Sequence, residues 1–256
     1  MSYAQISTDV ADHIMTITIR RKSKMNALTI DTIAEIGQAH HEGLQNNEVK
    51  GFIITGEGEK AFAAGADIAE FANFTPEQGK EMAEKGHKVF NALESSPKPT
   101  LALINGFALG GGCELAMSCH LRVASDKARF GQPEVSLGLI PGYGGTQRLV
   151  QLIGKTKALE YLLTGDMITA AQAETLGLVN YIGEPNSIEN TAKELLQKVF
   201  KKSPQAIGKT LDAVNAHFAE GVDGFQREIE QFGASFGTAE FKEGTTAFLE
   251  KRKPNF

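Results

Sequence analysis

Short apolar strands alternate with helices over most of this chain, and that alternation most constrains its fold. Apolar and threonine side chains alternate along 14–19, which is typical of a half-buried strand. Asp9 and Asp12 favour a turn, so a hairpin with the preceding segment is expected. Further strands are expected at 50–55, 100–105 and 120–124, and helices at 29–46, 75–95 and 114–118.

The chain beyond residue 204 differs, because it contains helical patterns with little strand content. Helices are expected at 204–218, 222–232 and 238–253, after a hinge at Lys201-Lys202-Ser203-Pro204. Alternating strands and helices followed by a helical tail predict an α/β core, residues 1–200, and a helical C-terminal region, residues 201–256.

The composition argues against several classes of function. The 256 residues carry a net charge of −5, whereas nucleic-acid-binding domains carry a basic excess, so nucleic acid is not an expected partner. The two cysteines, Cys113 and Cys119, are interpreted as buried thiols in a reducing compartment. Residues 1–10 show no secretory signal, and four glycines interrupt the apolar stretch 100–117. We therefore expect a cytoplasmic protein without a membrane segment.

A glycine-rich turn, 106–112, is expected between a buried strand and the helix that contains Glu114. Glycine lets a ligand approach the backbone closely, and a helix start leaves free N–H groups at its positive end. A nicotinamide-binding turn has a similar pattern. However, none of the four tyrosines is followed four residues later by lysine, as a short-chain reductase requires. The turn therefore favours a site for developing negative charge, with Glu114 as a helix-dipole partner or a functional acid.

Two further segments have a comparable character. The small residues of 61–68 follow an apolar strand, and they form either a tight packing turn or a loop that presents the Ala66 N–H to a ligand. Two such N–H groups from separate loops make an oxyanion hole. In 130–142, Glu134 follows Pro133 among apolar residues. An acid among apolar residues either has a partner or has a function. Burial would raise the pKa of Glu134 and let it hold a proton near neutral pH.

The candidate metal-binding and phosphate-binding motifs lack the residue spacing that such sites require. Gly154-Lys155-Thr156 resembles the end of a phosphate-binding loop, but Leu149 occupies the position of the first glycine that this motif needs. His40 and His41 are adjacent and cannot face one metal ion from a helix, so a solvated or packing role is expected. No metal site is predicted.

Taken together, five segments resemble the crotonase, or enoyl-CoA hydratase/isomerase, family. They span nearly the whole chain in family order: Asn26-Ala27-Leu28, AFAAGADI at 61–68, NGFALGGGCELA at 105–116, FGQPEVSLGLIPGYGGTQRL at 130–149 and FLEKRKPNF at 248–256. The resemblance implies a crotonase-like spiral of ββα repeats with a C-terminal helical trimerisation region. It also implies an acyl-CoA thioester substrate, a homotrimer or homohexamer, and no cofactor, because coenzyme A is part of the substrate.

The resemblance also implies roles for individual residues. Glu114 and Glu134 match the two catalytic glutamates of the hydratases, and Ala66 and Gly111 match the two donors of the oxyanion hole. Residues that match coenzyme A contacts are Ala64, Asp67 and Ile68 in one loop, and Phe248 and Lys251 near the C-terminus.

The presence of both glutamates favours hydration of a trans-2-enoyl-CoA to a 3-hydroxyacyl-CoA. Isomerases of the family often keep only the acid at the position of Glu134, so isomerisation or another enolate reaction is the alternative. Two positions depart from the family pattern. The proline often found after Arg21 is replaced by Lys22, another expected coenzyme A contact, and Tyr143 replaces a residue that is commonly small.

Overall fold

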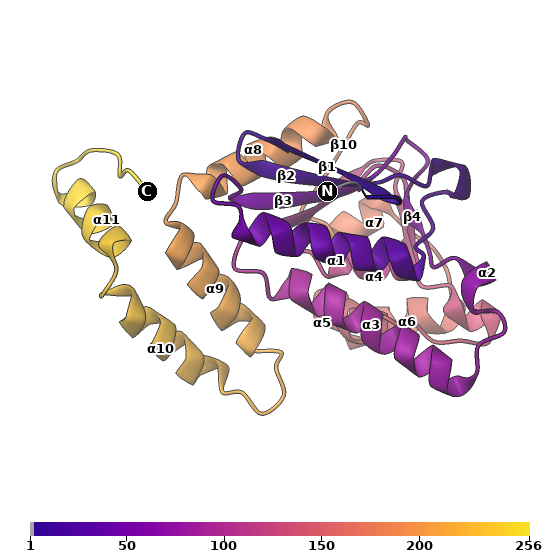
Figure 1. Ribbon diagram of the computed structural model, residues 1–256. Coiled ribbons are helices and arrows are strands. Elements are labelled where there is room, and N and C mark those ends of the chain that lie inside the picture. The colour runs from indigo at the N-terminus through magenta and orange to yellow at the C-terminus, as the bar shows by residue number, and fades with distance from the viewer. Residues whose placement is uncertain (1–2) are drawn as a thin grey trace.

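The computed structural model describes residues 3–256 and contains two β-sheets wrapped by helices (Figure 1). The larger sheet has the strand order β1-β2-β3-β5-β7-β10, and the smaller one has the order β4-β6-β8-β9. The strands of the larger sheet are β1 Ile6–Ala11, β2 Ile14–Ile19, β3 Gly51–Gly56, β5 Thr100–Ile104, β7 Leu121–Ser125 and β10 Tyr181–Gly183. Those of the smaller sheet are β4 Ala61–Ala64, β6 Phe107–Leu109, β8 Arg129–Gly131 and β9 Ile168–Thr169.

The two sheets arise from one repeated unit of two strands and a helical segment. In three successive units the first strand, β3, β5 or β7, joins the larger sheet, and the second, β4, β6 or β8, joins the smaller one. Within each sheet these strands run parallel, as in the pairs β3–β5 and β4–β6. The chain therefore advances as a spiral, with the second strand of each unit beside that of the previous unit.

Helices cover both faces of the larger sheet (Figure 1). Buried residues of β2 and β3, such as Ile17 and Phe52, belong to the main hydrophobic core together with α1 and α3 residues such as Ile36 and Phe90. A second, smaller core lies between the opposite face of the sheet and α8. The helices of this part are α1 Ile30–Gln45, α2 Ile68–Phe71, α3 Pro76–Glu94, α4 Gly111–Met117, α5 Gly145–Ile153, α6 Lys155–Thr164, α7 Ala170–Thr175 and α8 Ile188–Phe200, with short 3-10 turns η1 Lys22–Lys24 and η2 Glu134–Leu137.

Local sequence signals account for several of these boundaries. Thr29 starts α1 and Thr75 starts α3, each by accepting a hydrogen bond from the N–H three residues later in a reciprocal capping box. Pro76 follows as the first helical residue, where a missing N–H costs nothing. Both predicted helices are confirmed to within one residue at either end. The antiparallel pairing of β1 and β2 confirms the predicted hairpin, but its turn is Asp12–His13 alone, because Asp9 lies within β1 opposite Thr16.

Two predicted connections instead contain strands. The segment 61–68, expected to be a packing turn or a loop, begins with β4, and the expected glycine turn 106–112 includes β6. These two strands pair in parallel, with Ala64 opposite Leu109. Strands of three or four residues are too short to show a two-residue periodicity. Their pairing partners lie at least 22 positions away in the sequence, so only the tertiary structure reveals them.

The last three helices project away from the sheets (Figure 1). They are α9 Pro204–Ala216, α10 Gly224–Ser235 and α11 Ala239–Leu249, and α11 ends before the predicted limit at 253. Large apolar side chains such as Phe225 and Phe248 are more than four-fifths exposed on them. The division at residues 200 and 201 stays a prediction. Among the described residues, no helix is long and apolar enough to cross a membrane.

Candidate active site

A cavity of about 530 Å³ opens where the start of α4, the loop after β4 and the turn η2 meet. It brings together the four residues singled out in the sequence for catalysis: Ala66, Gly111, Glu114 and Glu134. Most of the remaining wall is apolar and comes from α2, α3 and the segment 137–143. Few polar groups in a largely apolar hollow are the usual composition of a site for a small organic ligand.

The glycines of the turn let the two loops approach each other. A Cβ on Gly112 would lie 1.9 Å from the Ala63 carbonyl oxygen, so only glycine fits against β4. Gly110 has a φ of +48°, in the region where residues with a side chain are strained. These two residues allow the first turn of α4 to lie directly against the end of β4.

This close approach places two backbone N–H groups side by side. A Cβ on Gly111 would lie 3.6 Å from the Ala66 nitrogen. Within residues 3–256, neither the Ala66 N–H nor the Gly111 N–H donates to a protein acceptor, whereas the neighbouring Asp67 N–H donates to the Leu28 carbonyl at 2.8 Å. Gly111 is the first residue of α4, where N–H groups have no partner within the helix. The pair can therefore donate to one oxygen of a ligand.

The Glu114 carboxyl group lies beside these donors and is 1% exposed. Its Oε1 accepts hydrogen bonds from the N–H groups of Tyr143 and Gly145, both at 2.7 Å. Burial raises the pKa of Glu114 to about 7, and the charge of Glu134 raises it further, while the two N–H donors act in the opposite direction. Glu114 can therefore exchange a proton near neutral pH.

Glu134 reaches the same cavity from η2. Burial also raises the pKa of this carboxyl above its usual range. Its Oε1 lies 2.6 Å from the position that a Cβ on Gly110 would occupy, so the carboxyl sits directly over the glycine turn. Within the described chain, its buried Oε2 has no hydrogen-bond partner. A buried carboxyl oxygen without a donor favours the protonated form, so Glu134 can hold a proton at the cavity that it lines.

A buried arginine, which the sequence reasoning missed, holds the loop that binds Glu114. Arg148 is 5% exposed, pairs with Glu94 at 2.7 Å and donates to the Tyr143 carbonyl at 2.8 Å. It also donates to Asn91 at 2.6 Å, so two of its partners lie on α3. Its position within a helical segment gives no sign of these long-range partners. Arg148 therefore fixes the Tyr143 peptide groups on which Glu114 depends.

The expected coenzyme A contacts divide into two groups. Ala64 and Ile68 line the cavity. The Asp67 carboxylate does not, and it pairs with Arg21 at 2.9 Å instead of capping α2 with its side chain. Lys22 is exposed outside the cavity lining. Phe248 belongs to α11 and Lys251 follows that helix, and neither residue lines the cavity of its own chain. Figure 1 shows α11 well away from α2 and α4, which border the cavity.

The remaining cysteine and histidine candidates have structural roles. Cys113 and Cys119 are buried free thiols, as predicted, and burial raises the pKa of each to about 12, which keeps them protonated. His40 is buried and packs on Phe52 with ring centroids 4.8 Å apart, in line with the expected packing role. In the part of the chain that the structure describes, no three histidine, cysteine, aspartate or glutamate residues are grouped to hold a metal ion.

Comparison with known proteins decides the family. The model of the enoyl-CoA hydratase/isomerase family matches residues 9–256. The chain belongs to this family. It is 45% identical to the short-chain-enoyl-CoA hydratase of Clostridium acetobutylicum over 94% of this chain and 92% of that protein. It is 42% identical to the crotonyl-CoA hydratase of Syntrophomonas wolfei over 100% of this chain and 99% of that protein.

Solved structures of this family have the same fold. An enoyl-CoA hydratase structure from Bacillus anthracis superimposes with a TM-score of 0.92 at 35% identity, covering 99% of each chain. A Geobacillus kaustophilus enoyl-CoA hydratase subunit gives a TM-score of 0.93 at 40% identity, covering 99% of this chain and 98% of that one. The predicted crotonase-like α/β fold, with helices at its C-terminal end, is thereby confirmed.

Proposed function

We propose that this chain is an enoyl-CoA hydratase, a hydro-lyase that adds water to a trans-2-enoyl-CoA and yields a 3-hydroxyacyl-CoA. The observation that carries the proposal is the convergence of the buried Glu114, the half-buried Glu134 and two free N–H groups on one cavity. The hydratase names of the relatives from Clostridium acetobutylicum and Syntrophomonas wolfei support the same reaction.

The N–H groups of Ala66 and Gly111 would hold the thioester carbonyl oxygen. Their donation draws electron density from the conjugated double bond and makes C3 electrophilic. As water attacks, negative charge develops on that oxygen, which is where fixed donors stabilise the transition state most. Loss of one such donor in other enzymes costs about 3–4 kcal/mol.

The two carboxyl groups would share the proton transfers. Glu114, ionised, takes one proton from the attacking water as the oxygen of that water bonds to C3. Glu134, protonated, delivers a proton to C2, so the product gains one water in all. Two acids with raised pKa values around one water suit a pair that shares a single proton.

The chemistry that this proposal needs comes from the substrate and the chain. Hydration transfers no electrons overall, and the thioester itself activates C2 and C3. Coenzyme A therefore enters as part of the substrate, and the proposal includes no separate cofactor and no metal.

A product-resolved assay tests the proposal. Hydration of crotonyl-CoA removes the absorbance of the enoyl thioester and gives 3-hydroxybutyryl-CoA, which chromatography identifies. Isomerisation, the alternative within the family, would move the double bond of a 3-enoyl-CoA without adding water. Conversion of 3-enoyl substrates without any hydrated product would reject hydration in favour of isomerisation.

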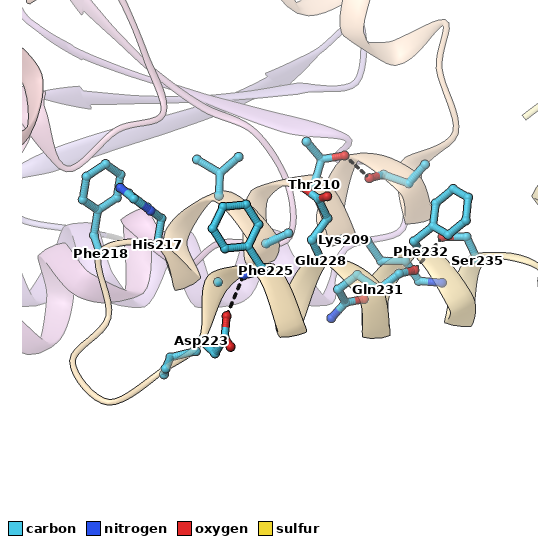
Figure 2. A pocket seen from close by; sticks show the side chains of 15 residues that line it. Lys209, Thr210, His217, Phe218, Asp223, Phe225, Glu228, Gln231, Phe232 and Ser235 are labelled. Carbon is cyan, nitrogen blue, oxygen red and sulfur yellow. Dashed lines mark hydrogen bonds between the residues drawn. The ribbon is translucent and has the colours of Figure 1, made fainter.

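We further propose that the chain assembles into a homotrimer or homohexamer through α9–α11. Figure 2 shows the groove between α9 and α10, where Phe225 and Phe232 lie on one helix and Phe218 follows the other. A monomer would leave these apolar side chains in water. In such an assembly, Phe248 and Lys251 of one copy would approach the coenzyme A of a neighbour. Light scattering tests this, since Phe232→Asp should lower the particle mass.

The two free thiols suit a reducing compartment, and we place the protein in the cytoplasm. Nucleic acid does not fit the net charge of −5.

A further inference from the structure

The side chain of Tyr143 occupies a position that the proposed mechanism does not explain. Its ring is 4% exposed and lines the cavity beside Glu114. One ring edge faces the glycine turn, because a Cβ on Gly111 would lie 3.3 Å from Tyr143 Cδ2. The opposite edge faces α3, because a Cβ on Gly86 would lie only 2.2 Å from Cδ1. The ring therefore packs tightly between the glycine turn at Gly111 and α3.

Packing against α3 prevents the Tyr143 ring from moving away from the cavity. Gly86 is buried in the middle of α3, where the absence of a side chain creates the space that the ring fills. Phe90, one turn later on the same helix, contacts the ring edge-on with centroids 5.4 Å apart. Interiors packed in this way do not admit a ring displacement without strain. Tyr143 thus forms a fixed wall.

This wall stands in the direction that the acyl chain must take. A carbonyl oxygen held by Ala66 and Gly111 places C2 and C3 near the two glutamates, so the carbons beyond C3 continue past Glu114. The Tyr143 N–H is bonded to the Glu114 carboxyl, and the Tyr143 ring fills the adjoining space. The next carbons of the substrate therefore meet the ring.

We propose that Tyr143, seated against Gly86, closes the acyl end of the cavity and makes the protein selective for short enoyl groups such as crotonyl over long ones such as 2-decenoyl. This inference rests on the proposed function, because it takes the cavity to be the acyl-CoA site. It adds a residue that determines specificity and names the substrate class as short-chain.

The test compares trans-2-decenoyl-CoA with crotonyl-CoA in three forms of the protein. In Tyr143→Ala the ratio of kcat/KM for decenoyl over crotonyl should rise at least about tenfold, since a single methylene in an apolar pocket is worth roughly 10- to 200-fold. In Tyr143→Phe, the matched control, the ring stays and the ratio should stay within about twofold. An unchanged ratio in a folded Tyr143→Ala variant would overturn the inference.

A second pair of variants keeps the test decisive if Tyr143→Ala does not fold. Gly86→Ala should push the ring into the cavity and weaken crotonyl-CoA turnover at least about tenfold. Adding the smaller Tyr143→Leu should restore most of that loss, because the two side chains compete for one space. Additive losses in the double variant would contradict this packing.

Binding of unreactive saturated acyl-CoAs separates this inference from the proposed function. Calorimetry gives the Kd of decanoyl-CoA and butyryl-CoA without any hydration. If Tyr143→Ala binds decanoyl-CoA more tightly relative to butyryl-CoA, but the natural protein hydrates no enoyl-CoA, the proposed function is rejected. The role of the Tyr143 ring as the end of the acyl site then stands. If hydration is normal and Tyr143→Ala changes neither the kcat/KM ratio nor the Kd ratio, only the role of Tyr143 in chain-length selectivity is rejected.

Discussion

Glu114 has two separable roles, and two substitutions can separate them. Its Oε1 accepts the Tyr143 and Gly145 N–H groups at 2.7 Å, and its carboxyl is proposed to take a proton from water. The amide oxygen of glutamine can accept both N–H groups in the same place but cannot act as the base. Glu114→Gln should therefore fold normally and lose roughly 10²- to 10⁴-fold in kcat.

Alanine at the same position removes the acceptor as well. Each buried donor left without a partner costs about 1–3 kcal/mol, so two N–H groups predict a destabilisation of about 2–6 kcal/mol. In a chain of this size each kcal/mol lowers Tm by roughly 2–4 °C. Glu114→Ala should thus melt well below both the natural protein and Glu114→Gln, while its activity falls at least as far.

The assay measures crotonyl-CoA hydration by all three proteins at pH 8, above the raised pKa of Glu114, where its carboxyl is ionised and can act as the base. Thermal unfolding is measured at pH 6, where the raised pKa keeps the Glu114 carboxyl largely neutral. Working below that pKa removes the cost of a buried charge from the comparison. Near-normal turnover by Glu114→Gln would refute the role as a base. An alanine variant as stable as the glutamine variant would show that the carboxyl does not hold the 143–145 loop.

Three further predictions concern the same site. Glu134→Gln should lose roughly 10²- to 10⁴-fold in kcat and still bind butyryl-CoA, so wild-type turnover would contradict its role as the acid. The pKa of Glu114 is raised from 4.5 to about 7 on folding, so its stabilising contribution is complete below pH 4.5 and is lost by about pH 7. Urea unfolding should therefore show that Glu114→Gln is less sensitive to pH across this window, by about 3 kcal/mol, and equal pH profiles would refute the shift. Arg148→Met should cost about 1–3 kcal/mol by leaving the buried Tyr143 carbonyl without its donor and should lower kcat more than it raises KM. An unchanged kcat would show that the arginine does not position the loop.

Several elements of the fold could be predicted because their signals are local. Thr29 and Thr75 each start a helix through a hydrogen bond three residues along the chain, and alternating side chains identify β2. The family segments predict a common site for the two acids and the two loops that supply the N–H donors. The strands β4 and β6 are not predicted, because they are defined by pairing with strands that are distant in the sequence.

The sequence by itself determined which chemical groups this protein possesses: two glutamates, a glycine turn and a loop of small residues, each beside a recognisable strand or helix. Only the tertiary structure decided what surrounds them. Burial raises the pKa of Glu114, Arg148 of α5 braces the loop that holds it, and Gly86 of α3 seats the Tyr143 ring. These relations join residues 5 to 57 positions apart, and they exist only where the packed core excludes water and brings distant segments into contact.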